Sequence, residues 1–117
     1  ELSTPSTVLS LALSPQGGRL AAGFADGSAT VWDLQHRRPL GTFHHQNLVS
    51  AIAFAGEDRL VTGSFDRSVR VWNIARPPMT GMLTALPHPA RIRSMAFDYG
   101  GDRLATLCEG DDRVRLW

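Results

Sequence analysis

Histidines and a lone cysteine are the side chains here that could bind a metal. The histidines are His36, His44, His45 and His88, and the cysteine is Cys108. A zinc site needs three or four converging ligands, usually with cysteine or carboxylate partners. One cysteine cannot form a paired-cysteine motif, and we interpret His36 and His44 as solvated loop residues. The sequence therefore predicts no metal site and no cofactor.

Three aspartates, Asp26, Asp66 and Asp111, are the candidates for acid–base chemistry. Each stands six residues before a tryptophan, the three being Trp32, Trp72 and Trp117. A catalytic carboxylate pair would break such a repeat, so the recurrence favours a structural turn residue. The chain has no G-x-S-x-G elbow, P-loop or dinucleotide-binding glycine motif. We expect Cys108 to be an inert thiol, and we predict no enzymatic activity.

The tryptophans mark an internal repeat that covers the chain. They are 40 and 45 residues apart, and an Arg-Leu pair recurs at 19–20, 59–60 and 103–104. Aligning the three copies requires a one-residue deletion in the second copy and a one-residue insertion near Cys108 in the third. Units of about 40–45 residues are typical of β-propeller blades.

Each copy contains short strands. The runs LSLALS, VSAIAF and IRSMAF alternate as half-buried strands do, and polar turns follow them, the third over 98–102. We expect four antiparallel strands per copy, with the outermost strand of the third missing. The predicted fold is all-β: an incomplete propeller ring of roughly 2.75 blades. The whole chain, 1–117, forms this segment, with blades at about 5–43, 46–86 and 89–117.

On these residues the sequence resembles the WD40 repeat family. The dipeptide that names the family stands as WD at 32–33 and as WN at 72–73, and the family's Gly-His is replaced by His44-His45 and Pro87-His88. The resemblance implies a buried tetrad in each blade that joins a loop His, a strand Ser or Thr, the turn Asp and the Trp. In the second copy these residues are His45, Thr62, Asp66 and Trp72.

The other two copies have incomplete tetrads. The third offers His88, Asp111 and Trp117, and the insertion displaces its Thr106. In the first copy Thr4 and Ala22 stand at the His and Ser/Thr positions, so only Asp26 and Trp32 remain. We expect the first blade to depend more on packing than on this network.

The resemblance also implies a partner surface at the narrow face of the ring, where the inter-blade loops and tight turns emerge. The corresponding positions are Thr7, Leu9 and Ala25, then Leu48, Ser50 and Phe65, then Arg91, Arg93 and Gly110. We predict partner contacts at Leu9, Leu48, Ser50, Phe65, Arg91 and Arg93, because these residues differ between copies. Aromatic and arginine residues are enriched at binding hot spots, and arginine can bind a carboxylate or phosphate through two parallel hydrogen bonds. Alternatively, Phe65 packs on the neighbouring blade and the arginines are only solvated.

The predicted function is a scaffold for protein–protein interaction, whose partner carries acidic and apolar residues. One alternative is a regulatory or sensor domain of a larger enzyme, such as a kinase or a nucleotide-hydrolysing switch. Nucleic-acid binding is another, but a net charge of +1 with dispersed arginines argues against it. We expect further blades of the same chain, or a second copy, to cover the unfinished sheets. No apolar run approaches the roughly 20 residues that span a bilayer, and we expect a cytoplasmic or other reducing location.

Overall fold

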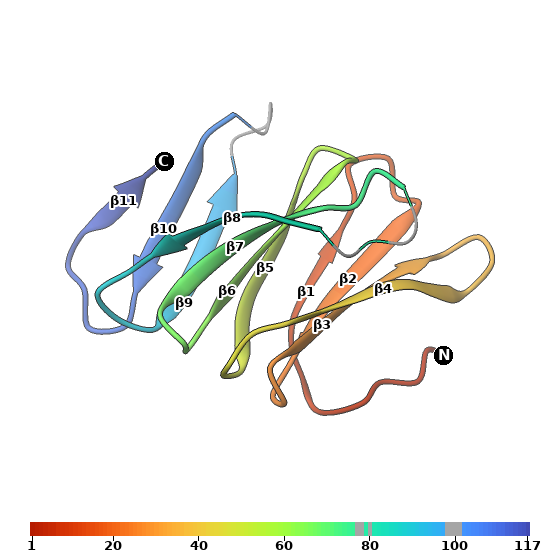
Figure 1. Cartoon of the computed structure of the whole chain (residues 1–117), viewed down its shortest axis with the longest axis horizontal. Helices are drawn as coiled ribbons and strands as arrows, with labels where there is room; N and C mark the ends of the chain where they lie inside the picture. The colour runs from red at the N-terminus through yellow and green to blue at the C-terminus, as the bar shows by residue number, and fades with distance from the viewer. Residues whose placement is uncertain (77–78, 80, 98–101) are drawn as a thin grey trace.

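The chain folds into a row of three antiparallel β-sheets (Figure 1). The structure, a computed structural model, describes residues 1–76, 79, 81–97 and 102–117. These residues form eleven strands. No helix in this part of the chain is long and apolar enough to cross a membrane. The turn predicted at 98–102 lies, except for Asp102, outside the described residues.

Strands follow one another in sequence order within each sheet. The first sheet contains β1 (Val8–Leu13), β2 (Arg19–Phe24), β3 (Ser28–Asp33) and β4 (Arg38–His44). The second contains β5 (Val49–Ala55), β6 (Arg59–Ser64), β7 (Ser68–Asn73) and β8 (Gly81–Pro87). The third contains β9 (Ile92–Phe97), β10 (Leu104–Cys108) and β11 (Val114–Leu116). This arrangement confirms the predicted all-β, partial propeller.

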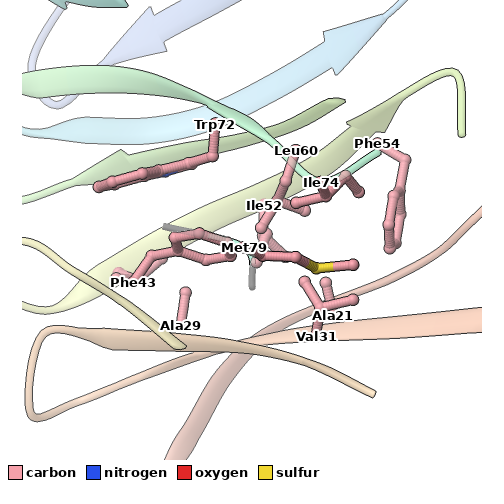
Figure 2. Packing of buried hydrophobic residues seen from close by; sticks show 11 residues of the cluster. Ala21, Ala29, Val31, Phe43, Ile52, Phe54, Leu60, Trp72, Ile74 and Met79 are labelled. Atoms are coloured by element: carbon pink, nitrogen blue, oxygen red, sulfur yellow. The ribbon is translucent and has the colours of Figure 1, made fainter. Parts of the chain in front are cut away.

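The main hydrophobic core lies between the first and second sheets (Figure 2). Phe43 on β4 packs against Trp72 on β7, with ring centroids 4.8 Å apart. Met79, from the connection between β7 and β8, is 2% exposed and fills the space beside them. A second core, which includes Val61 and Ile92, joins the second sheet to the third. Burial of these side chains is the main force that holds neighbouring sheets together.

A glycine on the second strand of a sheet lets the next sheet approach closely. A Cβ atom on Gly23 would lie 2.5 Å from Cγ1 of Val49, and one on Gly63 would lie 2.6 Å from Cγ2 of Ile92. Both distances are far shorter than a normal carbon–carbon contact of about 3.5–4.0 Å. Val49 and Ile92 begin the first strands of the following sheets, so each junction places a β-branched side chain over a glycine.

Apolar side chains remain exposed on the first and third sheets. Leu11 and Leu13 on β1 are 63% and 62% exposed, and Leu116 on β11 is 75% exposed. Large side chains of this kind are normally covered when they cluster on a sheet.

Candidate functional site

Four side chains of the second sheet form a continuous hydrogen-bond network. Nδ1 of His45 lies 2.8 Å from Oδ2 of Asp66, and Nε2 of His45 lies 2.6 Å from Oγ1 of Thr62. Nε1 of Trp72 donates to the same Thr62 hydroxyl at 2.9 Å. The structure therefore brings together the tetrad residues expected from the sequence, and the network ties the loop before β5 to the turn after β6.

The electrostatics of this network fix the direction of its hydrogen bonds. Burial lowers the pKa of His45 despite the nearby Asp66 carboxylate, which favours a neutral imidazole. Burial tends to raise the pKa of Asp66, but hydrogen bonds from Ser68 and His45 outweigh it and the pKa is lowered. Because the carboxylate can only accept, Nδ1 of His45 carries the proton, and Nε2 accepts from the Thr62 hydroxyl. Each of these groups therefore has a hydrogen-bond partner within the network.

The third sheet has a related network in which Thr106 takes part. Its hydroxyl lies 2.9 Å from Nε2 of His88 and accepts from Nε1 of Trp117 at 3.0 Å. Nδ1 of His88 lies 2.9 Å from the carbonyl oxygen of Leu86, which replaces the carboxylate. The expected displacement of Thr106 was wrong, because Thr106 pairs with Arg115 just as Thr62 pairs with Arg70.

Asp111 lies outside this network, contrary to its predicted place in the tetrad. Its carboxylate pairs with the guanidinium of Arg115, and the Arg115 hydrogen bond lowers the pKa of Asp111. The physical reason is a longer turn. The amide of Asp111 bonds to the carbonyl of Cys108, and Gly110 between them has φ +73°. The extra residue is accommodated after β10, so strand pairing up to Cys108 is unchanged.

The first sheet is held without a histidine. Asp26 accepts hydrogen bonds from the amide and hydroxyl of Ser28 at 2.8 and 2.6 Å. Trp32 packs edge-on against Phe24, with centroids 6.2 Å apart. Ala22 is buried, whereas Thr4 is exposed. Outside the tetrads, Nδ1 of His36 lies 2.7 Å from Oδ2 of Asp33. No group of three or more potential metal ligands occurs among the described residues.

The narrow edge is the end of the sheets at which the loops before β5 and β9 meet the turns after β6 and β10. The amide of Phe65 bonds to the carbonyl of Leu48 at 3.1 Å, and the amide of Glu109 bonds to the carbonyl of Arg91 at 2.8 Å. These matching bonds show that Glu109, and not Gly110, takes the position that Phe65 has in the second sheet. The sequence comparison missed Glu109 because it counted back from the tryptophan across the longer turn.

A β-bulge in each sheet controls another narrow-edge position. The pairing of β1, β5 and β9 with the next strand skips one residue. The skipped residues are Leu9, Ser50 and Arg93. Bulges re-aim side chains, and here they produce different outcomes. Arg93 is exposed and Leu9 is 44% exposed, whereas the Ser50 hydroxyl donates to the carbonyls of Ile92 and Gly63. Ser50 is therefore used to join sheets.

Four side chains at the narrow edge lie together, and we call Phe65, Arg91, Arg93 and Glu109 the Phe65 cluster. The guanidinium carbon of Arg91 lies 4.9 Å from the centroid of the Phe65 ring, a cation–π distance. Nη1 of Arg91 lies 3.6 Å from Oε2 of Glu109. Phe65, Arg93 and Glu109 line a hollow of about 340 Å³. Leu48 is half-buried beside this edge, and Leu9 belongs to the first sheet, outside the cluster.

Comparisons with known proteins agree with this architecture. The family model for the WD domain, G-beta repeat (WD40) matches residues 1–33, 37–73 and 82–117. The chain is 25% identical over 115 residues to small ribosomal subunit protein RACK1 of Drosophila melanogaster, covering 90% of this chain and 35% of that protein. It is 32% identical over 114 residues to transducin beta-like protein 3 of Mus musculus, covering 92% and 13%. The solved structure of U3-55K superposes with a TM-score of 0.83 at 29% identity, covering 100% of this chain and 36% of that one. The chain spans about a third or less of these relatives, and it belongs to the WD40 family.

Proposed function

We propose that this chain is part of a protein-interaction scaffold that holds a partner at the Phe65 cluster. Membership in the WD40 family supports a scaffold role. The observation that carries the proposed site is the aromatic ring of Phe65 beside two arginines on an accessible, hollowed edge. Aromatic and arginine side chains supply much of the binding energy in protein interfaces. The proposed mechanism is rigid presentation of these side chains, without chemistry.

The partner we propose is a peptide or loop with acidic and apolar residues. Arg93 is exposed, and no ion pair to it occurs within the described part of the chain. A partner carboxylate would find a free cation there. The hollow beside it has the ring of Phe65 as an apolar wall, which suits a leucine-sized side chain. The pairing of one charge with one apolar group gives the site its selectivity.

A peptide-display selection tests this proposal. We expect selected peptides to be enriched in Asp or Glu next to Leu, Ile, Val or Phe. Phe65→Ala and Arg93→Gln should each weaken the selected peptides about tenfold or more, as expected for hot-spot residues. Arg38→Gln, an exposed arginine on β4, is the matched control and should leave affinity unchanged. Selected peptides without acidic residues, or binding that survives both substitutions, would contradict the proposed site.

We also propose that the exposed apolar side chains of the first and third sheets are covered by further blades or by a second copy. Light scattering on the 117-residue chain, with Leu13→Lys and Leu116→Lys variants, tests the second possibility. A defined dimer or trimer that dissociates in these variants supports self-association. A stable monomer at high concentration would exclude it.

A further inference from the structure

We infer that Glu109 masks Arg91, so that Arg93 is the anchor available to a partner carboxylate. This inference rests on the proposed function and specifies which arginine performs it. The ligand is a peptide segment in which one carboxylate stands beside one apolar side chain. The carboxylate binds Arg93, and the apolar side chain enters the hollow against Phe65.

The backbone holds Arg91 and Glu109 side by side. The amide of Glu109 donates to the carbonyl of Arg91 at 2.8 Å, which places both side chains at the same point of the narrow edge. Their charged ends are 3.6 Å apart, and the side chains are 54% and 57% exposed. The pair is therefore formed before any partner arrives.

A partner carboxylate at Arg91 would only replace a carboxylate that is already present. The exchange forms one ion pair and breaks another of the same kind, so it contributes little to affinity. At Arg93 the partner's carboxylate replaces only water, and the contact keeps its full value. Glu109 therefore makes two neighbouring arginines unequal.

Stacking on Phe65 preserves the position of Arg91 when the mask is removed. The guanidinium carbon lies 4.9 Å from the ring centroid, a contact in which the Glu109 carboxylate takes no part. A variant without the Glu109 charge should consequently present two usable cations in place of one, with no rearrangement. The equivalent residues of the other sheets are Ala25 and Phe65, so among the described turns only the third carries this acid.

A double-mutant cycle on the 117-residue chain tests the inference. The probe is a fluorescein-labelled peptide with one Glu next to Leu, measured by fluorescence anisotropy. We expect Arg91→Gln to change the affinity less than 1.5-fold in the native background and roughly two- to fivefold in the Glu109→Gln background, the range expected for a surface ion pair. Arg93→Gln should weaken binding by the same factor in both backgrounds.

Asp112→Asn is the matched control, because it removes one negative charge from the same turn at a side chain that is 94% exposed and close to Arg113. If Glu109→Gln and Asp112→Asn increase the affinity for the probe equally, general charge repulsion explains the increase. The inference that Glu109 masks Arg91 would then be overturned. A native-background loss for Arg91→Gln as large as that for Arg93→Gln would also overturn it, while leaving the proposed function intact. If neither the native chain nor Glu109→Gln binds the probe, the acidic-partner function itself fails.

Discussion

Replacing Thr62 by valine is the most direct test of the hydrogen-bond network in the second sheet. Valine has almost the same shape as threonine, so Thr62→Val leaves no cavity at a residue that is 0% exposed. It removes the hydroxyl that accepts from Trp72 at 2.9 Å and donates to Nε2 of His45 at 2.6 Å. Both partner atoms are buried and would lose these hydrogen bonds.

Each orphaned buried group costs about 1–3 kcal/mol, so the loss of two partners in Thr62→Val should destabilise the fold by about 2–6 kcal/mol. A domain of this size has a total stability on the order of 5–15 kcal/mol, and the loss should be large in comparison. Urea unfolding followed by tryptophan fluorescence measures it as a lower midpoint at an unchanged slope.

Two further variants isolate the hydroxyl. Thr62→Ser keeps it and removes one methyl group, which should cost about 1 kcal/mol. Thr84→Val makes the same chemical change at an exposed position of β8 and should stay within about 0.5 kcal/mol of the native chain. If Thr62→Val matches Thr84→Val, or if Thr62→Ser is as damaging as Thr62→Val, the reasoning from the network is wrong.

Three other predictions concern protonation, close packing and the third sheet. Because His45 has a folded pKa below its ordinary 6.5, the unfolded chain binds more protons at mildly acidic pH, and stability should fall as pH drops below about 6.5. Urea midpoints between pH 7.5 and 5 should show this decrease, and His45→Gln should remove its contribution. Gly63→Ala should destabilise by about 1–3 kcal/mol through the clash with Ile92, whereas Gly18→Ala, with no atom within 4 Å, should not; equal midpoints would refute the clash. Asp111→Asn, which breaks only an ion pair with Arg115, should lower the urea midpoint far less than Thr106→Val, which orphans two hydrogen-bond partners.

The repeat predicted the strands well because strand pairing tolerates no slip. A shift of one residue would turn every buried side chain of β10 toward the opposite face. The same rule explains the error at Thr106: the inserted residue could only be absorbed in a turn, and Gly110 with φ +73° allows that. The insertion was expected near Cys108, but counting back six residues from Trp117 ran across the longer turn, which put Asp111 into the network and left Thr106 out of it.

The partner surface was less predictable. The sequence identified Phe65, Arg91 and Arg93 as unlike their counterparts in the other copies, but it could not show that Arg91 stacks on Phe65 and pairs with Glu109. Those contacts depend on which way two neighbouring loops point, and this is set by backbone hydrogen bonds at the narrow edge. Ser50 illustrates the same limit, since its hydroxyl turns inward to the carbonyl of Ile92.

The two junctions between sheets are built on the same contact, a glycine against a β-branched side chain. Val49 packs against Gly23, and Ile92 packs against Gly63. A duplicated unit would fit between two existing sheets if it had a glycine on its second strand and a β-branched residue at the start of its first strand. Such a unit would make the same contact at each of its two junctions. The third sheet differs, because Leu107 stands where the second sheet has Gly63. Leu107 pairs with Ser94 as Gly63 pairs with Ala51. A sheet that packs there must bring a smaller residue than valine or isoleucine, so this junction accepts a different neighbour from the other two.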